Sequence, residues 1–281
     1  MRPNPERVRA RNDQFQILLA LKTNRKKRSE ADEAFVEGTE AIKQADRAGL
    51  AFTRLACADA GTLSGWARDL AARHPEARLL EFGKDLYREI ADREEPSELI
   101  ATVRFPLTDL PSVGLSATPL ILVFDRPSDL GNLGSVIRSA NALGVDLVVL
   151  VGHGVDPRDP KAIRSSLGAV FDTPIAQAAS SEELERWLAH LKATRNLMVA
   201  GTDSTGAVPL QEAPLRRPLA LILGNEAKGM SQRLKAASDL LVSIPMVGRV
   251  NSLNVACAAT ALLWHVAYLS AQDGQTGEAH D

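Results

Sequence analysis

Short, uninterrupted apolar runs alternate with helical segments through the second half of this 281-residue chain. Leu120–Asp125 is one such run and ends in a polar loop, which is typical of a strand buried in a parallel sheet. A helix is expected over 132–143, with Gly144 as its C-cap, and a strand over 146–151. The alternation continues through 161–167, 181–193, 196–202, 219–223, 231–237 and 241–244. The pattern predicts an α/β domain with a parallel sheet.

The first half predicts a second, smaller α/β domain over residues 12–105. Its expected helices are 12–23, 39–48, 62–73 and 83–91, and its expected strands are 34–38, 50–56, 78–82 and 99–105. A flexible basic lead is expected at 1–11 and a Pro/Gly-rich linker at 106–119. The larger domain then spans 120–270, and the polar segment 271–281 is expected to be a disordered tail.

Composition excludes several classes of protein. No apolar run reaches the length of a transmembrane helix, and the N-terminus has no apolar core of a secretory signal. Cys57 and Cys257 lie too far apart in the sequence to suggest a disulfide framework. The histidines show no metal-ligand spacing. We therefore expect a cytoplasmic protein without a metal and without a membrane partner.

Charge is distributed unevenly along the chain. Residues 1–30 hold nine Lys/Arg against three Asp/Glu, whereas the whole chain has a formal net charge of −2. This asymmetry indicates either a basic face that meets a polyanion or a solvated face with no partner.

Three polar loops follow expected strands of the second half, where open α/β sheets place their ligands. The first contains Asn132 and Arg138, and its glycines fit neither the dinucleotide fingerprint nor the phosphate-binding P-loop. Arg138 would bind phosphate or form a structural ion pair. The second loop carries Asn225 and Glu226. The third leads into an apolar helix expected to be buried and to begin near Leu253, with Ser252 as N-cap, and by itself it would also fit an ordinary strand-to-helix connection.

These loops offer one Arg, one Glu, several amide and hydroxyl side chains and much free backbone, without a Ser-His-Asp set. Such a site can bind an adenine-bearing cofactor through the backbone. It can also orient a hydroxyl nucleophile for transfer of a group already activated on that cofactor, by positioning and electrostatics.

Three ordered motifs resemble those of the SpoU (TrmH-like) class of SPOUT RNA methyltransferases. They are Asn132-Leu-Gly-Ser-Val-Ile-Arg-Ser139, Leu223-Gly-Asn-Glu226 and Ile244-Pro-Met followed by Ser252-Leu-Asn-Val255. The first domain, with Phe35-Val-Glu-Gly38, is similar to the L30e-like domain often fused to this class. Length and Phe124-Asp-Arg-Pro resemble most the antibiotic-resistance ribosomal RNA methyltransferases of actinobacteria, such as the avilamycin-resistance type.

The resemblance implies a parallel sheet with a deep trefoil knot, a homodimer, and S-adenosylmethionine as the cofactor. The residues implied to bind the cofactor are Thr202, Leu223, Gly224, Asn225, Ile244, Met246, Ser252, Leu253 and Asn254.

The reaction implied is methyl transfer to a ribose 2′-hydroxyl of RNA. Arg138 would act near the partner's cofactor, binding phosphate and stabilising the developing alkoxide, because a guanidinium is effectively always protonated. Asn132 would orient the substrate, and Glu226 would hold Arg138 or the loop in place or act directly. Asn254 and Ser252 would shape the pocket.

RNA recognition would fall to the first domain. Arg25, Lys26, Lys27 and Arg28 would contact phosphates, and Arg164 would add a contact or stabilise the dimer. The expected substrate is 23S ribosomal RNA, and the role is either housekeeping or resistance to a ribosome-targeting antibiotic. The alternatives are a transfer-RNA methyltransferase, a catalytically silent RNA-binding protein of the same fold, and a Rossmann-type oxidoreductase, which would need the missing glycine fingerprint.

Overall fold

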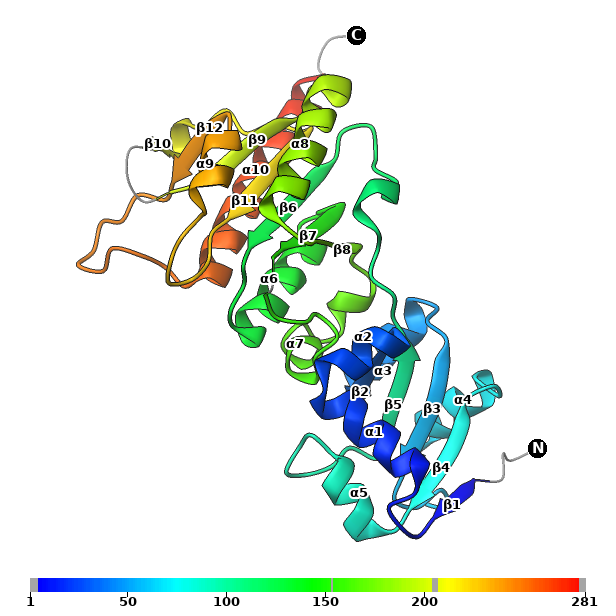
Figure 1. Ribbon diagram of the computed structural model, residues 1–281. Coiled ribbons are helices and arrows are strands. Elements are labelled where there is room, and N and C mark those ends of the chain that lie inside the picture. The colour runs from blue at the N-terminus through cyan, green and yellow to red at the C-terminus, as the bar shows by residue number, and fades with distance from the viewer. Residues whose placement is uncertain (1–4, 153, 204–206, 278–281) are drawn as a thin grey trace. The chain divides into compact units, whose positions relative to one another are not determined.

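The computed structural model describes residues 5–152, 154–203 and 207–277, which group into two compact units (Figure 1). Unit 1 contains the described residues up to Pro106 together with Asp156–Asp172, and unit 2 contains the remainder. The chain therefore leaves unit 2 after Val155, contributes a segment to unit 1, and returns at Thr173.

Unit 1 is built on a mixed five-stranded sheet with strand order β1-β4-β3-β5-β2. The β1, β4 and β3 strands run parallel, and β5 pairs antiparallel with both β3 and β2. The strands are β1 (Glu6–Val8), β2 (Glu33–Glu37), β3 (Phe52–Cys57), β4 (Arg78–Phe82) and β5 (Ile100–Arg104). The helices are α1 (Asp13–Thr23), α2 (Arg25–Ala31), α3 (Thr39–Arg47), α4 (Gly65–Arg73), α5 (Lys84–Ile90), α7 (Pro160–Ser165) and the 3-10 turn η2 (Ala169–Phe171).

Unit 2 is built on a seven-stranded sheet in which every pair is parallel, with strand order β10-β12-β9-β11-β6-β7-β8. The strands are β6 (Leu120–Asp125), β7 (Leu147–Val151), β8 (Ile175–Ala178), β9 (Met198–Thr202), β10 (Val208–Pro209), β11 (Leu219–Leu223) and β12 (Leu240–Ser243). The helices are α6 (Leu130–Ala142), α8 (Ser181–Arg195), α9 (Gln232–Ala237) and α10 (Val255–Gly277), with 3-10 turns η1 (Leu110–Ser112) and η3 (Leu210–Glu212).

The central strands of unit 2 are apolar because helices cover both faces of the sheet (Figure 1). All residues of β6, β7 and β11 are buried. Leu184, Leu188 and Leu191 of α8 pack with Ile121 and Val123 of β6 in one core cluster. Helices α6 and α10 pack against each other, where the Ser139 and Thr260 hydroxyls lie 2.7 Å apart. The parallel arrangement brings the carboxyl ends of β6, β9, β11 and β12 to the same edge.

Several expectations differ from this structure. The lead expected to be flexible contains β1, which pairs with β4, and α2 and β8 were not expected. The tail expected to be disordered from residue 271 is helical through Gly277, and residues 278–281 lie outside the described residues. Residues 156–172, expected in the larger domain, belong to unit 1.

Candidate active site

A cavity of about 360 Å³ opens at the carboxyl ends of β9, β11 and β12. Its volume lies in the range of small-molecule sites, roughly 300–1,000 Å³. Each residue expected to bind a cofactor lines it: Thr202, Leu223, Gly224, Asn225, Ile244, Met246, Ser252, Leu253 and Asn254. Asn132 and Glu226, expected to take part in the reaction, line it as well. The structure thus gathers the three sequence motifs around one cavity.

Apolar side chains make up much of the cavity wall, with polar groups at set points. Leu223, Ile244 and Leu262 contribute to the apolar lining. Asp203 and Lys235 also line the cavity, and Lys235 Nζ donates to the Asp203 carboxylate at 2.5 Å. An apolar wall with a few placed polar groups suits a flat heterocycle attached to a polar sugar.

Gly224 is required where the loop after β11 turns back on itself. A Cβ atom at this position would lie 2.4 Å from the backbone nitrogen of Met230 and 2.5 Å from the carbonyl carbon of Gly229. Asn225 and Gly229 exchange two backbone hydrogen bonds, of 3.1 and 2.9 Å, that close the loop. No side chain larger than hydrogen fits without moving backbone.

The Asn225 side chain holds this loop internally and ties it to the loop after β6. Its Oδ1 accepts from the amides of Ala227 and Lys228, at 3.0 and 2.9 Å. Its Nδ2 donates to the carbonyl of Arg126 at 2.7 Å. The motif asparagine is therefore satisfied as part of the scaffold of the cavity.

An ion pair between buried Asp125 and half-buried Arg126 supports the loops after β6 and β11. The fully buried carboxylate of Asp125, at the end of β6, accepts two hydrogen bonds of 2.9 Å from Arg126. It also accepts from the amide of Ser231 at 2.7 Å, and Arg126 donates onward to the carbonyl of Gly229 at 3.1 Å. The hydrogen bonds to Asp125 raise the pKa of Arg126 despite partial burial. The sequence signal that could have revealed this pair was Asp125 at the end of a buried apolar strand, because a buried carboxylate requires a partner.

Glu226 clamps the loop that begins α6. Its carboxylate accepts from the Ser128 hydroxyl at 2.7 Å and from the amides of Ser128 and Asp129, both at 3.2 Å. Burial alone would raise the pKa of Glu226, but the hydrogen bonds from Ser128, Asp129 and Asn132 outweigh it and lower this pKa. Of the roles expected for Glu226, the described contacts match holding the loop.

A polar chain links the starts of α6 and α10. Asn254 Nδ2 donates to Asn132 Oδ1 at 2.9 Å, and Asn132 Nδ2 donates to Glu226 at 3.4 Å. Asn254 Oδ1 also accepts from the Ala256 amide at 2.8 Å. The expectation of Ser252 as N-cap was wrong, because α10 begins at Val255 and Asn254 caps it.

Arg138 lies exposed on α6 and is not among the described residues that line the cavity. Helix α10, packed beside α6, was expected to be buried but has an exposed side. Its Trp264 and Tyr268 rings stack at 5.1 Å and are 56% and 48% exposed. An apolar surface therefore accompanies Arg138 on this face of unit 2.

The cations expected to contact RNA lie in unit 1. Lys26 and Lys27 are exposed on α2 and pair with Glu30, and Arg25 opens that helix. Arg28 does not fit a phosphate contact, because it is buried and its guanidinium donates to Asp156, to Asp159 and to two backbone carbonyls. Arg164 pairs with the Asp92 carboxylate within unit 1.

Among the described residues, no group of three or more His, Cys, Asp or Glu side chains is placed to hold a metal ion. Nor does the described part of the chain contain a helix long and apolar enough to cross a membrane.

Comparison with known families gives two matches that divide the chain in sequence order. Residues 12–101 match the SpoU L30e-like domain, and residues 119–264 match the SpoU rRNA Methylase family.

Two curated relatives are 23S rRNA methyltransferases by name. The 23S rRNA (uridine(2479)-2′-O)-methyltransferase of Streptomyces viridochromogenes is 37% identical over 264 residues, which cover 93% of this chain and 92% of the relative. The 23S rRNA (guanosine(2553)-2′-O)-methyltransferase RlmP of Bacillus subtilis (strain 168) is 33% identical over 185 residues, or 66% and 71% of the two chains.

Solved structures agree over nearly the whole chain. The SpoU methyltransferase AviRb from Streptomyces viridochromogenes, in complex with the cofactor AdoMet, superimposes with a TM-score of 0.86 at 36% identity, covering 93% of this chain and 99% of that chain. An RNA 2′-O ribose methyltransferase superimposes with a TM-score of 0.78 at 32% identity, covering 95% and 100%. The protein belongs to the SpoU rRNA methylase family, with a SpoU L30e-like domain preceding its methylase domain.

Proposed function

We propose that this protein transfers a methyl group from S-adenosylmethionine to a ribose 2′-hydroxyl in 23S ribosomal RNA. The observation that carries the proposal is the single cavity on which all three motifs converge, in a chain 37% identical to a 23S rRNA 2′-O-methyltransferase. The likeness to that Streptomyces viridochromogenes enzyme, whose structural counterpart AviRb was crystallised with AdoMet, supports both cofactor and substrate. A cytoplasmic location and a role in antibiotic resistance belong to the same proposal.

The residues around the cavity fit this cofactor. Apolar side chains such as Leu223 and Ile244 would enclose the adenine, and Thr202, Asn225 and Ser252 would lie near the ribose and the amino-acid portion. Gly224 lines the cavity without a side chain, so its main-chain groups would face the ligand. When bound, S-adenosylmethionine supplies a methyl group activated on a sulfonium.

The chain's own groups would position the ribose. The transfer forms a carbon–oxygen bond at the ribose, breaks the carbon–sulfur bond of the sulfonium and releases the hydroxyl proton. Asn132, fixed by Asn254 and Glu226, would orient the ribose by hydrogen bonding. Glu226 is committed to the loop before α6, so it would act through Asn132.

Arg138 would complete the site from a second copy of the chain. It is exposed outside its own cavity, and the stacked Trp264 and Tyr268 on the adjacent helix offer an apolar dimer surface. A guanidinium stays protonated at any physiological pH, so Arg138 would bind the neighbouring phosphate and stabilise the developing alkoxide.

Two further elements belong to the proposal. The segments 224–230 and 244–254, which both contribute to the cavity, would form a trefoil knot with α10 behind it. Unit 1 would bind RNA through exposed cations such as Lys26 and Lys27, giving affinity that falls with salt.

The test is transfer of radiolabelled methyl from S-adenosylmethionine to total RNA from a heterologous host, followed by separation of ribosomal and transfer RNA. Label in 23S RNA at one alkali-resistant linkage supports the proposal. Label in transfer RNA would keep the chemistry and refute the substrate. No label, with cofactor binding intact, would favour a silent RNA-binding protein.

A further inference from the structure

The segment Asp156–Asp172 belongs to unit 1, although the chain on both sides of it belongs to unit 2. We call this segment the strap. The chain therefore passes between the units at three places: after Pro106, after Val155 and after Asp172. A linker at residue 106 alone would have connected the two units, so the strap is an additional connection that needs its own explanation.

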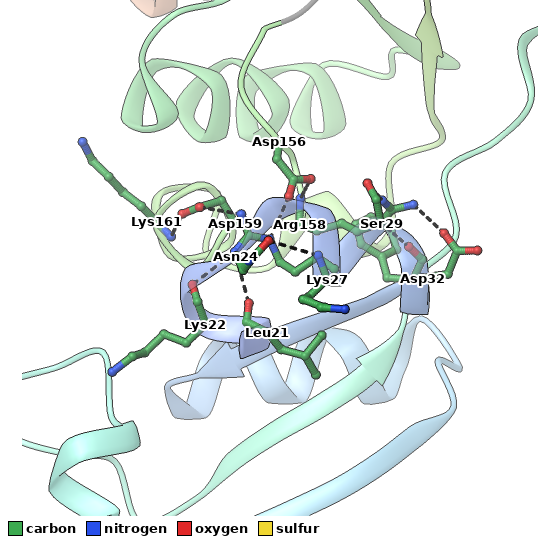
Figure 2. A network of polar contacts seen from close by, with 12 residues as sticks. Leu21, Lys22, Asn24, Lys27, Ser29, Asp32, Asp156, Arg158, Asp159 and Lys161 are labelled. Atoms are coloured by element: carbon green, nitrogen blue, oxygen red, sulfur yellow. Dashed lines mark hydrogen bonds and ion pairs between the residues drawn. The ribbon is translucent and has the colours of Figure 1, made fainter. Parts of the chain in front are cut away.

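Buried charges hold the beginning of the strap (Figure 2). The Arg28 side chain of α2, 3% exposed, donates from Nε to Asp156 at 2.7 Å and from Nη2 to Asp159 at 2.8 Å. Its Nη1 donates to the carbonyls of Leu21 and Lys22, both at 3.1 Å. A buried guanidinium satisfied in this way fixes the geometry of both carboxylates.

A second buried arginine belongs to the strap itself and donates hydrogen bonds to other parts of unit 1. Arg158 donates to the Phe105 carbonyl at 2.8 Å. It also donates to Asp32 at 2.8 Å and to the Ser29 hydroxyl at 3.3 Å (Figure 2). Asp32 is itself held in the left-handed region, with φ +48°, where α2 ends. The two arginines thus cross-link α2 and the strap reciprocally.

Close packing holds the rest of the strap. A Cβ atom at Gly168, where φ is +84°, would lie 2.8 Å from Gln44 Cβ and 3.0 Å from Ala41 Cα of α3. The Phe171 ring meets the Phe105 ring edge-on at 5.2 Å. The strap is therefore packed into unit 1 along one side, where Ile163, Val170 and Phe171 are buried, while Lys161 and Leu167 are exposed.

The chain just before the strap contacts the loop that precedes α6 in unit 2. The Val155 amide donates to the Pro127 carbonyl at 3.2 Å, and a Cβ atom at Gly154 would lie 2.9 Å from the same oxygen. Ser128 and Asp129 follow Pro127 directly and donate their amides to Glu226. The loop then enters α6, whose third residue is Asn132.

We propose that the strap couples unit 1 to the loop that positions Asn132. A shift of the strap when unit 1 binds RNA would move that loop through the Val155–Asp156 peptide bond. Arg28, Asp156, Arg158 and Asp159 are positioning residues in this scheme. The proposal rests on the proposed function in one respect, that unit 1 is where RNA binds. It explains why an arginine within a basic run is buried with two carboxylates.

Asp159→Asn is the sharpest perturbation. One oxygen of Asp159 caps α7 by accepting from the Lys161 amide at 3.0 Å, and the other accepts from Arg28. Asparagine is an equally good N-cap, so the substitution keeps the cap, while it removes the charge that faces Arg28 and replaces the accepting oxygen by an NH2 donor. The matched control is Asp46→Asn, which removes a partly exposed carboxylate that pairs with Arg73 elsewhere in unit 1.

The experiment compares amide hydrogen exchange, cofactor affinity and methyl-transfer kinetics of the full-length variants. We expect Asp159→Asn to speed exchange about tenfold both in the strap and in the Ser128–Asn132 amides. Cofactor affinity should stay within about twofold, and kcat with RNA should fall roughly tenfold. The Asp46→Asn control should change neither segment.

Faster exchange in the strap with unchanged exchange at residues 128–132 would overturn the coupling. So would unchanged exchange in the strap for both Asp159→Asn and the Asp156→Asn/Asp159→Asn double variant. Failure of the proposed function would be recognised separately. The wild-type chain would then transfer no labelled methyl to RNA, whereas the hydrogen-exchange comparison would still test the coupling.

Discussion

Replacing Gly224 with alanine should weaken cofactor binding without unfolding the chain. The added methyl group would lie 2.4 Å from the Met230 nitrogen, whereas ordinary van der Waals contact begins at 3.4 Å, so backbone must move by about 1 Å. Neither obstructing atom belongs to a side chain that can rotate away. Overpacking of this kind costs about 1–3 kcal/mol, and if binding must recover that energy the affinity falls roughly 5- to 150-fold.

Gly114→Ala is the matched control, because Gly114 lies in unit 2 outside the cavity lining, with nothing within 4 Å of its Cβ position. Isothermal titration with S-adenosylmethionine would give the two dissociation constants, and thermal denaturation would show that both variants fold. Wild-type affinity in Gly224→Ala, or an equal loss in both variants, would refute the assignment of this cavity to the cofactor.

Three further predictions follow from the same geometry. Arg138→Ala should bind the cofactor normally but transfer methyl roughly 100-fold more slowly. Mixing it with Gly224→Ala should restore activity, because a mixed dimer would pair one intact Arg138 with one intact cofactor site. If mixing restores no activity, Arg138 does not act across a dimer. Burial would raise the pKa of Glu226, but hydrogen bonds from Ser128, Asp129 and Asn132 lower it overall. Glu226→Gln should therefore lose about 1 kcal/mol of unfolding free energy at neutral pH, a small figure because solvent reaches the carboxylate. This difference should vanish as the pH falls through the lowered pKa, and a difference independent of pH in denaturant titrations would refute the clamp. Asn132→Ala and Asn254→Ala should be non-additive in a double-mutant cycle by about 1 kcal/mol, whereas strict additivity would exclude their contact.

The strands of unit 2 were predictable because burial leaves a simple pattern. β6, β7 and β11 are buried on both faces, so each is a continuous apolar run with clear ends. β8 has four residues including Gln177, and β1 has three residues including Glu6 and Arg7 at a sheet edge. Such short or polar strands are defined by the neighbour that they pair with, which local sequence does not specify.

The position of the strap could not be predicted, because sequence order places it inside the methyltransferase domain. What assigns it to unit 1 is the pairing of Arg28 with Asp156 and Asp159, across about 130 positions of sequence. The same pairing corrects the interpretation of Arg28 as an RNA contact. A run of basic residues shows charge but not which member is buried.

The grouping of the cavity residues followed from the motifs, whereas their individual contacts did not. Ser252 and Asn254 are both good N-caps by type, and the start of α10 at Val255 selects Asn254. Asp125 and Arg126 support two loops, but adjacent opposite charges at a strand end do not indicate which loops they hold.

The most direct measurement is mass spectrometry of 23S RNA fragments from a heterologous host that expresses either the wild-type chain or Arg138→Ala. The account predicts one ribose-methylated nucleotide in the wild-type sample, resistant to alkaline cleavage and strongly reduced in amount with Arg138→Ala. A methyl group on a base, or an unmodified 23S RNA beside a modified transfer RNA, would contradict it.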